Sequence, residues 1–149
     1  MKLAATTLAA ALGWSACSAV GPDALPTAAA SRELILRAGE SANTEAAGLR
    51  VGFVGVSSDS RCPKGERCVW AGDAVVQVWL QRGAEPRESL ELHVAPGDGQ
   101  AAQALGHELR LVRLDPYPVS GRPIAQRDYV ATLMLVRSTK PGNQGTVSR

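Results

Sequence analysis

Cysteine is the residue type with the clearest chemical options in this chain of 149 residues. Cys62 and Cys68 are separated by five residues, which is too wide for a Cys-x-x-Cys redox pair, and no second Cys or His pair follows at a zinc-ligand spacing. In an oxidising compartment this arrangement favours a disulfide. Closing a ring of seven residues would add about 2.4 kcal/mol to the stability of the folded domain. Cys17 then remains for a different purpose.

Histidines and carboxylates offer few catalytic arrangements. His93 and His107 are the only histidines, and His93 falls on the polar face of a predicted strand. The chain contains no serine-hydrolase, zinc-protease or phosphate-binding motif. Asp59 and Asp73 flank the cysteine pair as a conceivable acid–base pair, but Asp59 is better explained as an Asx-turn residue. We therefore expect no enzymatic activity, no metal site and no cofactor.

The first residues of the chain are typical of an export signal. Met1 and Lys2 supply a positively charged start, and ten mostly apolar residues follow from Leu3 to Leu12. Ten residues span about 15 Å as a helix, which is too short to cross the hydrocarbon core of a bilayer. We therefore predict that residues 1–16 form a signal peptide that is removed on export.

The segment around Cys17 resembles the lipobox of bacterial lipoproteins, because two small residues stand directly before the cysteine. Trp14 departs from this pattern, which usually has an aliphatic residue there. The resemblance implies lipidation of Cys17, a membrane anchor and a flexible tether over residues 17–31. Under the alternative, cleavage occurs near Ala19 and Cys17 is lost with the signal peptide.

The residue after the cysteine bears on localisation. Ser18 rather than Asp follows Cys17, which in Gram-negative lipoproteins implies sorting to the outer membrane. We expect an outer-membrane lipoprotein that faces the periplasm or the cell surface. Without the anchor, the chain would be a periplasmic or secreted protein.

The charge balance argues against a polyanion-binding protein. Sixteen Lys and Arg residues against fourteen Asp and Glu give a formal net charge of +2, and the basic residues are scattered along the chain. We expect no nucleic-acid partner. The length fits a single domain, which we place at residues 32–139, followed by a disordered tail at 140–149. The sequence makes no prediction of oligomeric state.

Hydrophobic residues of the predicted domain recur with a period of two, which is typical of half-buried strands. The alternation slips in the second and fifth predicted strands, which predicts bulges, and the sixth is apolar on both faces, which predicts a central position. We expect an all-β fold: a single small antiparallel barrel or sandwich, OB-like in size. The six predicted strands lie near Leu34–Leu36, Leu49–Val56, Ala74–Gln81, Ser89–Val94, Leu109–Leu114 and Tyr129–Val136.

Two segments are expected outside these strands. Ser41–Gly48 is rich in turn-forming residues and is predicted to be a loop. Ala101–Leu109 comes nearest to a helical pattern and is predicted to hold one helical turn.

The ring between Cys62 and Cys68 predicts a tight turn, since it contains Pro63 and Gly65. One interpretation is a disulfide-braced connection between two strands. The other is a rigid recognition loop, which a partner could bind without first ordering it. The candidate binding residues are Arg61, Lys64, Arg67 and Trp70.

Two tryptophans in the predicted domain need an explanation. Trp70 is expected to pack over the disulfide or to close one end of the core. Trp79 shares a strand face with Gln77 and Gln81. It is a binding candidate if that face is exposed and structural if the face is covered, and we favour the structural interpretation.

Several elements of residues 51–136 form a recognisable pattern: DSRCP at Asp59–Pro63, then Cys68, WAG at Trp70–Gly72, LVRLDPYP at Leu111–Pro118 and DYVATLMLV at Asp128–Val136. With these elements the chain resembles a family of small bacterial lipoproteins and secreted proteins, most of them uncharacterised. The resemblance covers most of residues 51–136, is specific for the family and says little about activity. A more distant resemblance is to potempins, small β-barrel lipoprotein inhibitors of secreted proteases.

These features together predict a non-catalytic envelope protein that binds a protein or another ligand. One alternative is an inhibitor of secreted proteases that presents the Cys62–Cys68 loop, in which Arg61, Lys64 or Arg67 would meet a trypsin-like protease. The other alternative is a structural or assembly accessory of the envelope.

Overall fold

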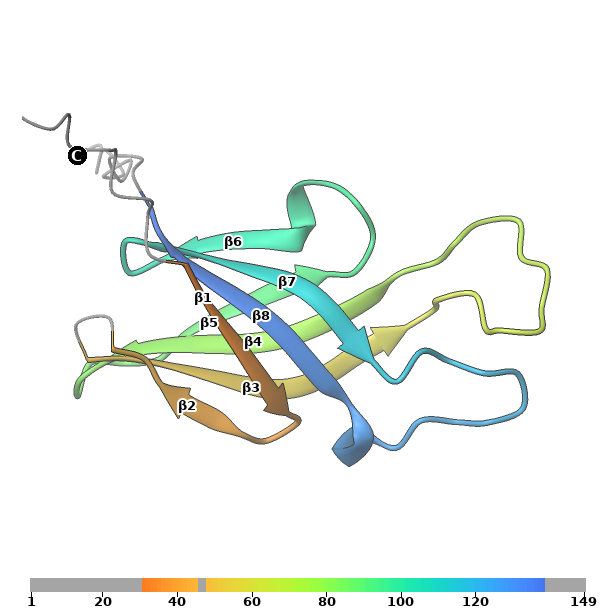
Figure 1. Ribbon diagram of the computed structural model, residues 1–149, viewed down its shortest axis with the longest axis horizontal. Coiled ribbons are helices and arrows are strands. Elements are labelled where there is room, and N and C mark those ends of the chain that lie inside the picture. The colour runs from red at the N-terminus through yellow and green to blue at the C-terminus, as the bar shows by residue number, and fades with distance from the viewer. Residues whose placement is uncertain (1–30, 46–47, 139–149) are drawn as a thin grey trace, which may run out of the picture.

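The structure is a computed structural model and describes residues 31–45 and 48–138. These residues form eight strands and two short 3-10 helices (Figure 1). The predictions for the signal peptide, for Cys17 and for the tail at 140–149 lie outside the described residues. The elements are β1 (Ser31–Arg37), β2 (Ser41–Asn43), β3 (Leu49–Asp59), β4 (Ala74–Arg82), β5 (Glu88–His93), η1 (Asp98–Gln100), β6 (Ala101–Ala104), β7 (His107–Asp115), η2 (Gln126–Asp128) and β8 (Val130–Arg137).

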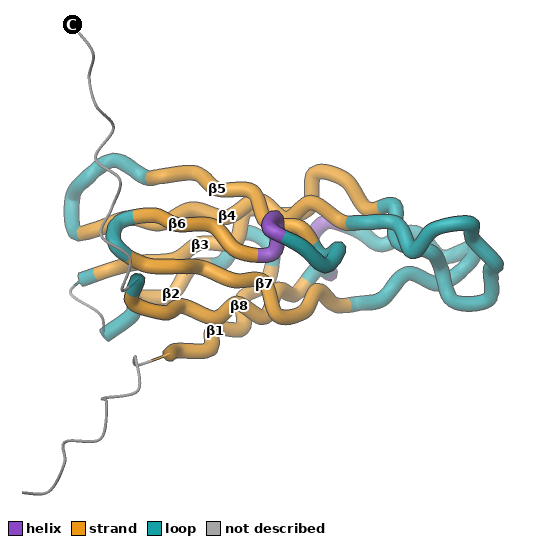
Figure 2. The backbone as a smooth tube through the Cα atoms, turned by 90° about the horizontal axis from the view of Figure 1, so that it is seen from above, coloured by secondary structure: helices purple, strands orange, loops and turns teal. Residues whose placement is uncertain are grey.

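The eight strands form two antiparallel sheets of four strands each. Sheet A has the order β1-β8-β7-β6, and sheet B has the order β2-β3-β4-β5 (Figure 2). The predicted all-β class is confirmed. Within residues 31–45 and 48–138 the strand pairing gives two separate sheets, so the sandwich alternative applies and no closed barrel is formed.

Each of the six predicted segments overlaps a strand, and two further strands occur. β2 lies in the segment predicted as a loop. β6 replaces the helical turn predicted from residue 101, because Ala101–Ala104 pairs with β7 across a tight turn in which Leu105 and Gly106 have positive φ values of 50° and 73°. A run of alanines carries little alternation, so neighbouring strand pairing decides its conformation.

The two slips of alternation and the central strand are confirmed. The register of β3 against β4 shifts between Phe53 and Gly55 and again between Val56 and Ser58. The register of β7 against β8 shifts between Leu111 and Arg113. β8 lies between β1 and β7.

Apolar side chains from both sheets meet in one core between the layers. Phe53 is the largest of the fully buried side chains and the one phenylalanine of the chain. Neither 3-10 helix has the length or the apolar character needed to cross a bilayer, and the described residues contain no other helix. The main core residues are Leu34, Leu36, Leu49, Val51, Phe53, Val76, Val78, Leu80, Leu92, Leu109, Leu111, Leu114, Ala131, Leu133 and Leu135.

Candidate binding site at the loop apex

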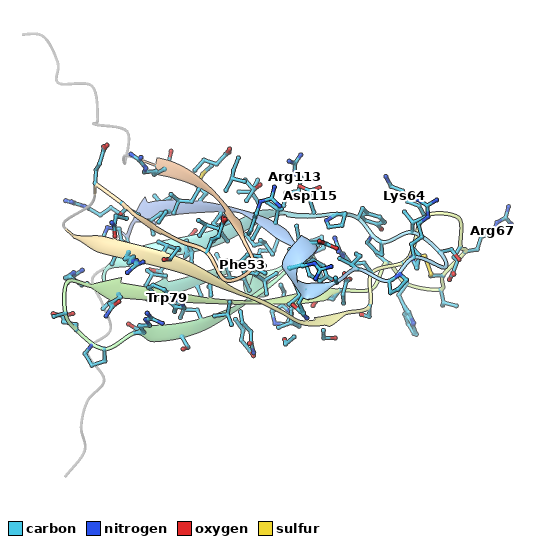
Figure 3. All side chains as sticks on the ribbon, turned by 90° about the horizontal axis from the view of Figure 1, so that it is seen from below. Phe53, Lys64, Arg67, Trp79, Arg113 and Asp115 are labelled. Atoms are coloured by element: carbon cyan, nitrogen blue, oxygen red, sulfur yellow. A yellow bond between two sulfur atoms is a disulfide. The ribbon has the colours of Figure 1, made fainter. Side chains whose placement is uncertain are left out.

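Two long loops project beyond the sheets at the same end of the sandwich (Figure 1). The cysteine loop, residues 60–73, connects β3 to β4. The proline loop, residues 116–125, follows β7 and contains three prolines. Lys64 and Arg67 lie at the far end of the projection (Figure 3). We call the outer part of the cysteine loop, residues 64–70, the apex.

The base of the cysteine loop continues the pairing of β3 with β4. The Ser60 amide donates to the Asp73 carbonyl at 2.7 Å, and the Cys62 amide donates to the Ala71 carbonyl at 2.8 Å. The predicted disulfide between Cys62 and Cys68 is formed, with the two Cα atoms 5.9 Å apart. The apex is therefore closed at its neck by backbone hydrogen bonds and by a covalent bond.

The conformation and surroundings of Gly72 explain why the WAG element ends in glycine. Its φ of +72° lies in the left-handed region that favours glycine. A Cβ atom at this position would lie 1.8 Å from the Ser60 carbonyl oxygen on the opposite side of the loop base. Only a residue without a side chain lets the two sides of the loop approach this closely.

Hydrogen bonds join the cysteine loop to the proline loop. The Lys64 amide donates to the Pro118 carbonyl at 3.0 Å, and the Ser120 amide donates to the Lys64 carbonyl at 3.2 Å. The Ser120 hydroxyl also donates to the Glu66 carboxylate at 2.6 Å. Two segments that are distant in the sequence therefore hold each other in place.

Arg61 is the internal anchor of this pair of loops, which corrects its prediction as an exposed binding residue. Only 5% of its surface is exposed. Its guanidinium donates to both carboxylate oxygens of Asp59, at 2.8 and 2.6 Å. It also donates to the carbonyls of Leu114 at 2.9 Å and Pro116 at 3.1 Å, where β7 passes into the proline loop. All three guanidinium nitrogens are in use, so this group is committed to the protein itself.

The Asp59 carboxylate binds both the backbone amide and the guanidinium of Arg61. The Arg61 amide donates to the Asp59 carboxylate, which confirms the predicted Asx-turn. The Tyr129 hydroxyl donates to the other carboxylate oxygen at 3.0 Å. Burial by itself raises the pKa of Asp59, but the hydrogen bonds from Arg61 and Tyr129 outweigh it and lower that pKa. Burial and the bond to Asp59 together raise the pKa of Tyr129 to about 12.

Tyr117 links the buried arginine to the apex. Its ring centroid lies 5.3 Å from the Arg61 guanidinium carbon and 5.5 Å from the Lys64 ammonium nitrogen. Both distances lie within the range of cation–π attraction. Lys64 therefore contacts the proline loop twice, through its backbone hydrogen bonds and through its ammonium group.

Val69 and Trp70 are the most exposed large apolar side chains of the described residues, at 89% and 80%. The prediction that Trp70 packs over the disulfide or closes the core is therefore wrong. The cysteine loop extends past the ends of both sheets, so core residues do not reach it (Figure 2). Arg67 is also exposed, and within the described residues its backbone groups form no hydrogen bond with other backbone groups.

Trp79 is covered, as the structural interpretation predicts, and only 9% of it is exposed. Its ring lies against Gly52 on the neighbouring strand, where an added Cβ would come within 2.1 Å of the indole. The guanidinium carbons of Arg87 and Arg50 lie 4.1 and 5.9 Å from the ring centroid. The indole therefore lies against a glycine of the neighbouring strand and has two guanidinium groups over its ring.

The other titratable pair near the loop base is Asp73 with His93, whose ring Nδ1 lies 2.6 Å from the carboxylate. Burial raises the pKa of Asp73, but hydrogen bonds from His93 and from the Ala95 amide outweigh it and lower that pKa.

In residues 31–45 and 48–138, no group of three or more His, Cys, Asp or Glu side chains is placed to hold a metal ion.

An open cavity of about 410 Å³ lies between the two loops. Its lining includes Asp59, Arg61 and Glu66, whose charged groups are already bonded to each other or to Ser120. Glu66 and Arg122 are the exposed charged residues of the lining. The cavity therefore offers little that would select a small ligand, and the exposed apex is the stronger candidate.

Comparisons with protein-family models, with curated proteins and with solved structures gave no match for this chain. The assignment of a function therefore depends on the site itself.

Proposed function

We propose that the chain is a non-catalytic binding protein of the bacterial envelope and that the apex is its binding surface. The observation that carries this proposal is the contrast between the exposed pair Val69 and Trp70 and the rigid loops beneath it. Large exposed apolar side chains on a braced loop mark interaction sites, because a partner gains their burial without the cost of ordering the loop.

The carboxylates near the apex support a binding role over an enzymatic one. Asp59 is bonded to Arg61 and Tyr129, and Asp73 is bonded to His93 and the Ala95 amide. Each carboxylate is committed to holding the loop base. The arrangement stabilises structure and leaves neither of them poised to exchange protons with a substrate.

Site-specific photo-crosslinking in the native cells tests this proposal. A benzophenone amino acid replaces Trp70 in one variant and Val112, an exposed residue on the body of sheet A, in the control. We expect a discrete protein or lipid adduct from position 70 and none from position 112. No adduct from position 70, or the same adduct from both positions, would overturn the apex as the binding surface.

Inhibition of a trypsin-like protease is a second candidate, favoured by the exposure of Arg67. Lys64 is a poorer contact residue, because its amide and carbonyl are already bonded to the proline loop. If the chain is such an inhibitor, Arg67→Ala abolishes inhibition in a panel of secreted proteases and Lys64→Ala retains it. Equal inhibition by both variants, or none by the unmodified chain at micromolar concentration, rejects this candidate.

Export and lipidation at Cys17 are part of the proposal and rest on the sequence of the segment that precedes the domain. Labelled fatty acid is expected to enter the unmodified chain and not Cys17→Ala. Equal labelling of both chains would remove the anchor from the proposal and leave the apex unaffected.

A further inference from the structure

The apolar pair at the apex has the composition of a membrane-interface contact. Val69 is aliphatic, and Trp70 combines a large apolar ring with one N–H donor. Tryptophan is enriched at the boundary between headgroups and hydrocarbon, because its ring is apolar while its N–H remains hydrogen-bonded. The two residues are consecutive and almost fully exposed, so they could enter such a layer together.

Three cations lie on the two loops at this end of the domain. Lys64 and Arg67 belong to the apex, and Arg122 lies on the proline loop two residues from Ser120. All three are exposed. Glu66 is the acidic side chain among these residues, and it accepts the hydrogen bond from Ser120. Three cations and one anion leave a net charge of +2, which is complementary to an anionic surface.

The shape of the projection favours a fluid partner over a flat protein surface. A stable protein interface buries about 800 Å² on each partner, contributed by about 20 or more residues. The apex is a short segment of one loop, residues 64–70, and its exposed large apolar side chains are Val69 and Trp70. A bilayer surface conforms to so small a projection, and its surface potential acts on every nearby cation at once.

The chain enters the domain at the end of sheet A away from these loops. Ser31 pairs with Val136 near the end of β8, whereas the proline loop leads into the start of β8. The apex is therefore not the point at which the preceding segment of the chain joins the fold.

We propose that the apex inserts Val69 and Trp70 into the headgroup region of an anionic phospholipid bilayer, with Lys64, Arg67 and Arg122 binding the lipid phosphates. This inference rests on the proposed function and names the partner of the same surface. Insertion is shallow, because peptide groups without internal partners oppose entry into the hydrocarbon core and the backbone at Arg67 forms no backbone hydrogen bond within the described residues.

Tryptophan fluorescence reports this insertion. The test uses the full chain carrying Trp14→Phe, which leaves the exposed Trp70 and the covered Trp79. Vesicles contain either phosphatidylcholine alone or an equal mixture of phosphatidylcholine and phosphatidylglycerol. With the anionic vesicles we expect a blue shift of the emission and quenching by brominated lipid. Trp70→Ala in the same chain should remove both signals and weaken vesicle binding about tenfold or more.

Charge variants separate the electrostatic contribution. Arg67→Ser should weaken binding to anionic vesicles about fivefold and leave binding to neutral vesicles unchanged. Arg113→Ser and Val112→Ala, on the body of sheet A, are the matched controls and should bind like the parent chain. The N-terminal segment is common to all these chains, so differences among them report the apex.

The inference is overturned if anionic vesicles produce no blue shift or bromine quenching of Trp70, or if Trp70→Ala binds as tightly as the parent. The proposed function has a separate outcome. A protein adduct from the photo-crosslinker at position 70, without any vesicle signal, rejects the lipid partner and keeps the apex as a binding surface. If position 70 gives neither an adduct nor a vesicle signal, the lipid partner and the apex as a binding surface are both rejected.

Discussion

Tryptophan and arginine are covered or bonded in the body of the sandwich and at the loop base, whereas they are exposed at the apex. Trp79 on the body lies against Gly52 and has two guanidinium groups over its ring, whereas Trp70 at the apex is exposed to solvent. Arg61 at the loop base uses all its guanidinium nitrogens on the protein, whereas Arg67 extends into solvent. Residues below the apex fix its shape, whereas Arg67, Val69 and Trp70 on it stay exposed.

Replacing the two arginines should give the largest difference in stability between the two regions. Arg61→Met leaves Asp59 without its charge partner and two carbonyls without donors, so unfolding free energy should fall by about 3–5 kcal/mol. Arg67→Met should change it by less than about 0.5 kcal/mol. Urea denaturation of both variants measures the difference, and similar midpoints would show that Arg61 is not the anchor of the loops.

Replacing Trp79 should also cost more stability than replacing Trp70, and the difference should be smaller than that between the two arginine variants. Trp79→Ala removes a buried ring and exposes the gap above Gly52, so we expect a loss of about 3 kcal/mol. Trp70→Ala removes a side chain with few contacts and should leave stability within about 0.5 kcal/mol. Thermal unfolding by circular dichroism compares the variants. A large loss for Trp70→Ala would mean that the apex ring is structural.

Removing the disulfide should loosen the apex more than the body. The double variant Cys62→Ser with Cys68→Ser is expected to lose about 2.4 kcal/mol, because its unfolded chain is no longer constrained by the seven-residue ring. Amide hydrogen exchange should quicken more at residues 60–73 than in β3 and β4. An unchanged melting temperature would contradict the bracing role of the disulfide.

The bond between Tyr129 and Asp59 should give the smallest effect, visible at alkaline pH. The pKa of Tyr129 is near 10 in the unfolded chain and about 12 in the folded one. Its contribution is therefore complete below pH 10 and is lost as the pH rises through 12. Tyr129→Phe should cost about 1 kcal/mol at pH 7. The stability difference between parent and variant should then shrink above pH 10, and a constant difference would refute the assignment.

Local sequence patterns predicted much of the body. Period-two alternation located six strands, and its slips at Gly55 and after Leu111 predicted the bulges. The disulfide followed from cysteine spacing. The short strand β6 was missed, because its alanine-rich sequence has no distinct alternation and its pairing with β7 decides its conformation.

The candidate site was predicted less well because its contacts are long-range. Arg61 was expected to face solvent, but its acceptors on Leu114 and Pro116 lie in a distant part of the sequence. Trp70 was expected to be covered, since the sequence gives no sign that the loop extends past both sheets. The Asx-turn at Asp59 was predicted correctly, because both its partners lie close together in the chain.

The pairing of Lys64 with the proline loop has a consequence for engineering this surface. A cyclic peptide that copies residues 62–68 would retain the disulfide ring but would lose the bonds to Pro118 and Ser120 and the ring of Tyr117 beneath Lys64. Transplanting the apex onto another sandwich therefore requires both loops, with Asp59, Arg61 and Tyr129 at their base. For the same reason, an insertion in either loop must preserve its alignment with the other.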